Sequence, residues 1–414
     1  MHNETVRRFQ IVINGKNNSL LENRNIKIVG SRCVGPCMED IKIVATEGSK
    51  RYWSNPADWP SKAVPKEGED IHIEPGWDMI YDLTDSPVYR LIRVNGILTF
   101  SNATNTHLRC KHLFVRAGEL HIGSKDLPYP KQARITLYGA KEEDAIVYDN
   151  AIEGGNKLIA NVNKISIWGQ ARKQTVTRLT AEALFGANSF KVEPGLDLVA
   201  GDRLGLAPTS FELLAADYVH VTSYDNVTGL VNINTTLEHY HWGAAASTAS
   251  KYNGVDIRGE VMILSRNIII SGENIEGWGG QIVTSDTIEG DLTVRYGSTI
   301  MHNVEVYNCS QVNTMKAAIR FEGASGAYSH VSNCSFHNGL GWGVNIISSA
   351  NVRFESNIVF SFKPIGLSIL TARNITIHNN IVSYIYERDL GKLEMFVDRR
   401  AGMTICGLLF EFGD

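Results

Sequence analysis

An asparagine returns at nearly regular intervals through the second half of the chain, each time shortly after alternating apolar residues. Asn308, Asn333, Asn357 and Asn380 are separated by intervals of 25, 24 and 23 residues. Repeats of this length are typical of stacked architectures, because one unit alone is too short to bury a hydrophobic core. This period constrains the fold more than any other feature of the sequence.

A second pattern repeats in step with the asparagines. The segments "AIRF" at 318, "GVNI" at 343, "GLSI" at 366 and "GMTI" at 402 share the order small, apolar, polar, apolar. Such alternation is typical of β-strands, and the Leu-x-Leu scaffold of a leucine-rich repeat is absent. The sequence therefore predicts an all-β protein in which residues 258–414 form a right-handed parallel β-helix with about 23 residues per coil.

Stacking explains why an asparagine would return. In a β-helix each residue lies about 4.8 Å from its counterpart in the next coil, so inward-facing asparagines can hydrogen-bond through their amides. The intervals slip by one residue, which makes Ser356 and Asn379 rival positions for this ladder. Burial also predicts that the Asn-Cys-Ser triplets at the first two positions carry no glycan. The predicted ladder consists of Asn308, Asn333, Asn357 and Asn380.

The charge balance and the absence of long apolar runs exclude two kinds of partner. With 40 basic and 44 acidic residues the formal net charge is −4, so there is no basic excess for binding nucleic acid. No run of 18 apolar residues occurs, and the first residues lack the apolar core of a signal peptide. Two interpretations remain, a cytosolic protein or a piece of a longer secreted chain.

Two features favour the secreted chain. Asn-x-Ser/Thr triplets accept N-linked glycans in exposed loops of secreted proteins. Cys33 and Cys37 flank a Gly-Pro turn in "CVGPC", which is typical of a tight disulfide in an oxidising compartment, although a chance pair of thiols has the same spacing. The glycosylation candidates are Asn102, Asn226, Asn234 and Asn374.

A polysaccharide-degrading enzyme would need a particular set of groups on the β-helix surface. A hydrolase needs two carboxylates about 5–10 Å apart, and a lyase needs a base with a neutralising group. Arg320 and Glu322 are the catalytic candidates, but an acid beside an arginine is more often a surface ion pair. The expected exposed row is Arg320, Asn345, Ser368 and Thr404, and the next row is Glu322, Ile347, Leu370 and Cys406.

Three further groups of residues are candidates for ligand binding. His239 and His241 share one face of the strand "HYHW", as a metal site requires, but no third ligand is identifiable. Trp278 and Trp342 stand among glycines, where an exposed ring can stack on a sugar and a buried ring can wedge against a turn. An acidic loop offers oxygen ligands for calcium, and a solvated loop has the same composition. Its acids are Asp286, Glu289 and Asp291.

Residues 51–172 consist of short strands broken by single glycines. The stretch "WSNPADWP…VPKEGEDIHIEPGWDMIYDL…LIRVNGILTF…LFVRAGELHIGS" resembles the eight-glycine (G8) domain of the fibrocystin and fibrocystin-L family, which is related to cell-migration-inducing hyaluronan-binding protein. The likeness continues through "HYHWG" and "RGEVMILSRNIIISG". The resemblance implies a G8 domain stacked on the β-helix as its cap. The end of a preceding β module would occupy 1–50, and β hairpins at 173–257 would bridge to the helix.

The resemblance also implies a function. The family consists of large cell-surface proteins, so we expect an extracellular structural, adhesive or receptor-type module whose only membrane anchor lies in a parent chain. Extracellular glycans or surface proteins are the expected partners, and no cofactor other than calcium is expected. The alternative is a glycosaminoglycan-binding or -depolymerising protein. The hyaluronan-linked relatives carry a His-x-His-like stretch where this chain has Arg320 and Glu322, which disfavours an enzyme.

Overall fold

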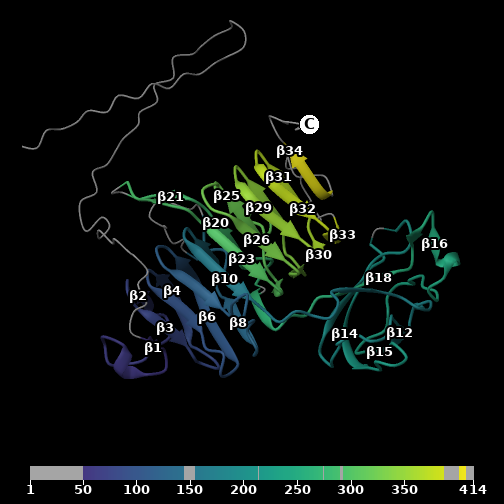
Figure 1. Ribbon diagram of the computed structural model, residues 1–414, viewed down its shortest axis with the longest axis horizontal. Coiled ribbons are helices and arrows are strands. Elements are labelled where there is room, and N and C mark those ends of the chain that lie inside the picture. Colours follow the sequence, from purple (N-terminus) through teal and green to yellow (C-terminus); the bar gives the residue numbers. More distant parts are fainter. Residues whose placement is uncertain are drawn as a thin grey trace, which may run out of the picture. The chain divides into compact units, whose positions relative to one another are not determined.

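The computed structural model describes residues 50–143 and 154–386, except 213, 274, 290 and 291, together with the backbone of 401–406. Regular structure in these residues is almost entirely β-strand, with two short 3₁₀ turns, η1 (Pro56–Asp58) and η2 (Thr248–Ser250). Two large sheets consist of parallel strands stacked in chain order from β1 to β34 (Figure 1). The fold is therefore an all-β parallel β-helix, as the repeat predicts.

The first sheet holds nine parallel strands, and it runs without a break from the glycine-rich segment into the later repeats. The glycine-rich coils are thus the first coils of the same β-helix. Trp53 and Trp59 pack edge to face, with ring centroids 5.1 Å apart, inside the first of these coils. In spatial order the strands are β1 (Lys50–Tyr52), β3 (Asp78–Tyr81), β5 (Ile97–Phe100), β7 (Glu119–Ile122), β10 (Lys164–Trp168), β23 (Ser298–His302), β26 (Ser329–Ser332), β29 (Ala350–Glu355) and β32 (Arg373–His378).

The second sheet bends into two faces at β6 (Thr106–Val115), which pairs with β8 through residues 106–110 and with β9 through 112–115. One face continues through β8 (Ala133–Leu137), β19 (Ile268–Gly272), β24 (Val304–Tyr307), β27 (Ser335–His337), β30 (Ile358–Phe362) and β33 (Ile381–Ile385). The other includes β2 (Asp70–Ile73), β4 (Val88–Val94), β9 (Leu158–Asn161), β20 (Gln281–Thr284), β25 (Ile319–Glu322), β28 (Val344–Ile347), β31 (Ile365–Leu370) and β34 (Ala401–Cys406). Each later coil therefore has three strands, as in β23, β24 and β25.

The repeated apolar segments stack in register. Ile319 pairs with Val344, Val344 with Leu367, and Leu367 with Met403. These residues alternate with polar ones, so Ile319, Val344 and Leu367 lie in the hydrophobic core while their polar neighbours face away from it. The strand register that the "AIRF" and "GVNI" pattern predicts is confirmed.

The asparagine ladder forms over its last two positions only. Asn380 Oδ1 accepts the backbone N–H of Asn357 at 2.9 Å, and Asn357 Oδ1 accepts the backbone N–H of Cys334 at 2.9 Å. The amide of Asn357 also donates to the Val331 carbonyl at 3.0 Å. Cys334 therefore occupies the ladder position that the sequence analysis assigned to Asn333.

The other two predicted ladder residues belong to different rows. Asn333 has φ 53° and lies in line with Ser356 and Asn379, whose φ angles are 53° and 52°. Asn308, with φ 49°, follows β24 and so belongs to another turn of the coil. Asparagine tolerates this left-handed conformation better than most residues, so several turns of the coil select it. Placing Asn308 and Asn333 in the ladder was wrong for this reason.

An antiparallel insertion interrupts the helix between β10 and β19. Met262 and Leu264 of this insertion pack against Ile358 and Phe360, so the insertion covers the outer surface of β30. It extends past residue 257, because β18 pairs with β11 and β13. Its strands are β11 (Val176–Arg178), β12 (Ser189–Lys191), β13 (Arg203–Leu206), β14 (Asp217–Tyr224), β15 (Leu230–Ile233), β16 (Lys251–Tyr252), β17 (Val255–Asp256) and β18 (Glu260–Ile263); a further hairpin of β21 (Thr287–Ile288) and β22 (Val294–Arg295) follows β20.

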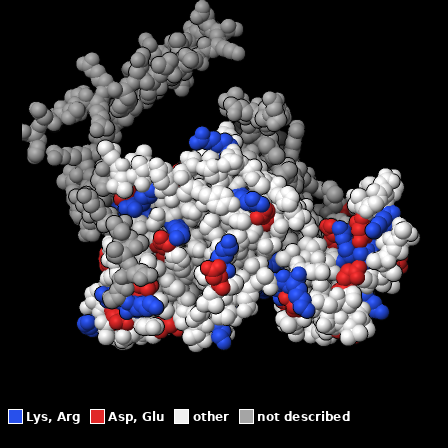
Figure 2. Space-filling view, in the orientation of Figure 1, with Lys and Arg blue, Asp and Glu red and all other residues white. Residues whose placement is uncertain are grey.

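Charged side chains of opposite sign lie next to one another on the visible surface (Figure 2). Figure 2 shows Lys and Arg interleaved with Asp and Glu on the face in view, in keeping with the net charge of −4. In the described part of the chain, no helix is long and apolar enough to cross a membrane.

Candidate functional site

The outer surface of the first sheet gathers aromatic and titratable side chains from separate coils. Trp168, His302, Ser332 and Glu355 end β10, β23, β26 and β29, and they stand in register. Their inward neighbours, such as Met301, are buried in the core. Because side chains alternate across a strand, the four terminal residues point away from the core and form one row.

Four side chains of this surface contact one another in sequence. The rings of Trp168 and His302 stack with centroids 3.9 Å apart and an interplanar angle of 16°. His302 meets His330 edge to face at 4.6 Å, and His330 Nε2 lies 2.7 Å from Glu355 Oε1. We call Trp168, His302, His330 and Glu355 the histidine strip.

The first histidine of the strip is held in its neutral form. Burial lowers the pKa of His302 to about 4, and the neighbouring His330 lowers it further in the same direction. Its Nδ1 shares a hydrogen bond with Ser332 Oγ, whereas its Nε2 is buried without a hydrogen-bond partner. At neutral pH the stacked rings of Trp168 and His302 are therefore uncharged, and His302 Nε2 is one unused polar atom beside them.

The other end of the strip carries a negative charge. Arg353 and His330 both hydrogen-bond to Glu355, and these bonds lower its pKa although partial burial opposes them. An ionised carboxylate accepts hydrogen bonds from hydroxyl groups. The neighbouring aromatic rings provide a surface on which a flat apolar face of the same ligand can stack. Sugars offer both kinds of surface.

The strip lacks the pair of acids that glycoside hydrolysis needs. Glu355 is the single carboxylate on the five fully described strands β10, β23, β26, β29 and β32. Glu119 on β7 lies four strands from β29, which at about 4.8 Å per strand places it roughly 19 Å away. Hydrolases hold their carboxyl groups about 5–9.5 Å apart. The strip is therefore suited to binding and not to two-carboxylate hydrolysis.

The row proposed for catalysis is in register but buried. Arg320, Asn345 and Ser368 stack as expected, yet each is almost fully shielded from solvent. Asn345 Nδ2 reaches the Met315 carbonyl at 3.5 Å, so the segment before β25 covers this row. Arg320 forms an ion pair with Glu322 at 2.9 Å. The expectation of an exposed row was wrong, and the ion-pair interpretation is the one the geometry supports.

The two tryptophans proposed to stack on sugars are wedged into the structure. Trp278 and Trp342 are each only 7% exposed. The Trp278 indole donates to Asn156 Oδ1 at 2.7 Å, and Trp342 packs with Ala317 and Ile365. Neither ring is available to a sugar, so the packing interpretation replaces the binding one.

The two histidines proposed for a metal meet a third group. His241 Nε2 lies 2.7 Å from Asp217 Oδ2, and His239 Nδ1 lies 3.5 Å from the same oxygen. The other ring nitrogen of His241 bonds to the Ala207 carbonyl at 2.9 Å. Burial would raise the pKa of Asp217, but the bonds from His241 and the Glu238 amide lower it. Both nitrogens of His241 are thus engaged by protein acceptors, which makes this a hydrogen-bonded anchor and not a metal site.

The acids proposed for calcium are engaged by protein donors. Asp286 accepts three backbone N–H groups from neighbouring loops at 2.8–3.0 Å. Glu289 pairs with Arg116 at 3.2 Å and with Arg295 at 2.5 Å. Asp291 lies outside the described residues. The two described acids therefore tie loops together.

The four glycosylation candidates are all exposed. Asn102, Asn226, Asn234 and Asn374 lie in loops or on an outer surface, where a glycan has room. Asn308 and Asn333 are half-buried. Occupancy stays a prediction at all of these positions. Cys33 and Cys37, proposed to form a disulfide, lie outside the described residues.

Comparison with known proteins identifies the glycine-rich coils. The family model of the G8 domain matches residues 58–180, from η1 through β11. Mouse fibrocystin is 26% identical over 345 residues, which cover 81% of this chain. Human fibrocystin-L is 21% identical over 336 residues, which cover 74% of it. Residues 58–180 therefore form a G8 domain, and the chain as a whole is similar to fibrocystin and fibrocystin-L.

This G8-domain chain spans 8% of the length of mouse fibrocystin and of human fibrocystin-L. Among solved structures, the tailspike gp61 of Pseudomonas phage phi297 is similar with a TM-score of 0.23 and 11% identity, over 72% of this chain and 39% of that one.

The histidine strip was not predicted from the sequence. Its members come from four strands, and the insertion separates Trp168 from His302 along the chain. The signal that would have found three of them is a shared position at the ends of first-sheet strands, where Trp168, His302 and Glu355 each follow an inward apolar residue, whereas His330 lies two residues before the end of β26. Only the strand register of the G8 coils and of the later repeats together reveals that row.

Proposed function

We propose that this chain is a rigid extracellular module of a cell-surface glycoprotein, with a structural or adhesive role. The supporting observation is the unbroken first sheet, in which the G8 coils and the later repeats share one continuous set of strand pairs from β1 to β32. Such a stack resists bending, because each coil is hydrogen-bonded along its length to the next. The exposed triplet asparagines and the relationship to fibrocystin-like proteins fit a surface location.

The proposal predicts that the protein does not shorten glycosaminoglycans. Purified protein is incubated with sized hyaluronan, with and without calcium, and the polymer is analysed on a gel. We expect an unchanged length distribution, because the histidine strip holds one carboxylate and the Arg320 row is buried. A shift to shorter polymer that requires the folded protein would contradict the structural role.

A second candidate function is glycan binding, and the histidine strip supports it. If the strip binds sugars, Trp168→Ala should weaken binding to hyaluronan oligosaccharides about tenfold, because it removes the stacking surface beside His302. Trp168→Phe should keep most of the affinity. Isothermal titration measures both changes.

The matched control is Tyr252→Ala, which removes an exposed ring from the β16–β17 hairpin of the insertion. This variant should bind as the unaltered protein does. Equal affinity of Trp168→Ala and the unaltered protein for hyaluronan oligosaccharides would exclude the strip as the binding surface. A failure of both proteins to bind these oligosaccharides would exclude it as well.

A further inference from the structure

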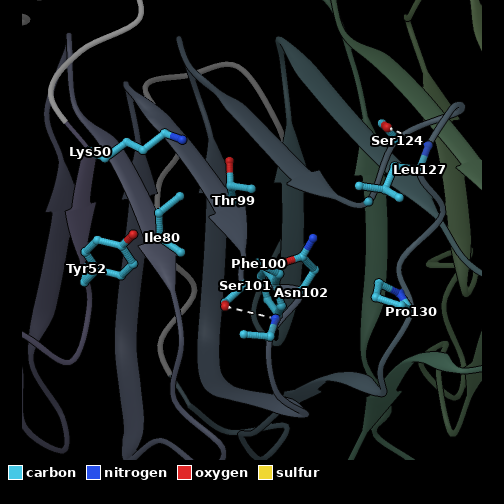
Figure 3. A pocket seen from close by; sticks show the side chains of 12 residues that line it. Lys50, Tyr52, Ile80, Thr99, Phe100, Ser101, Asn102, Ser124, Leu127 and Pro130 are labelled. Carbon is cyan, nitrogen blue, oxygen red and sulfur yellow. Dashed lines mark hydrogen bonds between the residues drawn. The ribbon is translucent and has the colours of Figure 1, made fainter.

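A groove of about 480 Å³ opens on the outer surface of the first sheet in the G8 coils. Its floor comes from β1, β3 and β5 through Tyr52, Ile80 and Thr99, and its rim comes from the loops at 101–103 and 123–130 (Figure 3). Small-molecule sites span about 300–1,000 Å³, so this groove has room for about one or two sugar rings.

The groove exposes apolar surface to water. Tyr52 is 47% exposed, and Leu127 on the opposite side is 61% exposed (Figure 3). Ile80 and Pro130 add further apolar lining between them. Covering such surface is favourable by about 25 cal/mol per Å², so the groove favours an occupant with apolar faces.

One of the residues that line the groove, Asn102, is a potential attachment site for an N-linked glycan. Asn102 lines the groove and begins the triplet Asn-Ala-Thr, so a sugar attached to its side-chain nitrogen starts inside the groove. We propose that the inner N-acetylglucosamine residues of an N-linked glycan on Asn102 lie in this groove and cover Tyr52 and Leu127. The inference rests on the proposed extracellular location, because N-glycans are added to chains that enter the secretory pathway.

The groove also has hydroxyl groups that can hydrogen-bond to a sugar. Ser101 Oγ accepts the Ala103 N–H at 3.4 Å, which is the dashed line in Figure 3, and Ser124 Oγ accepts the Leu127 N–H at 3.1 Å. Each hydroxyl therefore keeps its own proton to donate. A sugar ring has apolar faces for Tyr52 and Leu127 and an edge of hydroxyl and acetamido oxygens for the serines.

The test compares how fast the glycans are released from the folded protein. The chain is expressed in mammalian cells that secrete it, and peptide-N-glycosidase is added under native conditions. Mass spectrometry of glycopeptides follows Asn102 and, as the matched site, Asn226 in the turn between β14 and β15. We expect release at Asn102 to be about tenfold slower, corresponding to about 1.4 kcal/mol of packing.

Two further measurements identify the groove as the cause. Denaturation should make the two release rates equal, and the double variant Tyr52→Ser, Leu127→Ser should accelerate release at Asn102 alone. Thr104→Ala abolishes the triplet while leaving Asn102 in place, and it should lower the Tm by about 2–4 °C. Thr228→Ala does the same for Asn226 and should lower the Tm only by the loss of its exposed hydrogen bond to Asp225.

Each contrary outcome has a distinct meaning. An empty Asn102 beside an occupied Asn226, Asn234 or Asn374 would overturn this inference and leave the extracellular location standing. Four empty sites in the secreted chain would overturn both. Occupied sites with equal native release rates would show a glycan that points into solvent, and the groove would then belong to another ligand.

Discussion

Replacing Glu305 by alanine should lower the free energy of unfolding by about 3–5 kcal/mol. Glu305 on β24 is fully buried and accepts hydrogen bonds from His337 Nε2 at 2.9 Å and from the Arg203 guanidinium at 2.5 Å. It also accepts the backbone N–H of Arg266 at 2.9 Å. Removing the carboxylate leaves these donors buried without an acceptor. Urea unfolding followed by tryptophan fluorescence measures the change.

The position of this carboxylate predicts which part of the protein loosens first. Arg203 belongs to the insertion, whereas Glu305 and His337 belong to the helix, so the ion cluster joins the two. In Glu305→Ala we expect faster protease cleavage in the connection at 169–175 than in the first sheet. Glu67→Ala, at an exposed position, should change stability by no more than about 0.5 kcal/mol. Equal stability of the two variants would contradict the role of the cluster.

The same cluster has a pH signature. Burial would raise the pKa of Glu305, but the bonds from His337 and Arg203 lower it below the ordinary value of about 4.3. A carboxyl whose pKa is depressed in the folded state stabilises the fold above its unfolded pKa, and this stabilisation is lost as the pH falls through the folded pKa. The stability difference between the unaltered protein and Glu305→Gln should therefore be constant above about pH 5 and shrink below about pH 4.

Regular spacing made the repeated strands predictable from sequence. Ile319, Val344 and Leu367 stack as the "AIRF", "GVNI" and "GLSI" pattern predicts, because an inward apolar residue is required at the same point of every coil. The spacing of the asparagines is a weaker guide to which residues stack on one another. The left-handed backbone at Asn308 and at Asn333 selects asparagine in two different turns, so equal spacing does not prove that the residues stack.

Exposure was less predictable than register. Arg320 stands on the outward side of its strand, and alternation alone predicts that it is exposed, but the segment before β25 covers the row. The sequence did not predict that Asp217 is the partner of His241, because Asp217 begins β14 whereas His241 lies in an isolated β-bridge beyond β15. Contacts made by covering segments and insertions follow no period, so a single sequence does not reveal them.

The glycines of the G8 coils have a packing reason that a substitution can test. Gly96 and Gly118 occupy equivalent turns of successive coils, each just before a first-sheet strand. A Cβ added to Gly118 would lie 1.8 Å from the Gly96 carbonyl oxygen, and one added to Gly96 would lie 2.3 Å from the Glu74 carbonyl oxygen. The turn of the next coil also lies close, because the Asn163 side-chain amide donates a hydrogen bond to the Gly118 carbonyl at 2.9 Å. Backbone atoms cannot move aside as a flexible side chain would.

Gly118→Ala should therefore destabilise the protein by about 3 kcal/mol or more, at the upper end of overpacking effects. The matched control is Gly68, which has φ +78° and nothing within 4 Å of an added Cβ. Gly68→Ala should cost only about 1–2 kcal/mol of backbone strain, and Gly68→Asn should recover most of it, because asparagine tolerates that conformation. Gly118→Asn should recover nothing, since the clash and not the backbone angle limits the site. Urea unfolding of the four variants distinguishes the two causes, and a recovery at Gly118 would show that the coils are able to separate at this turn.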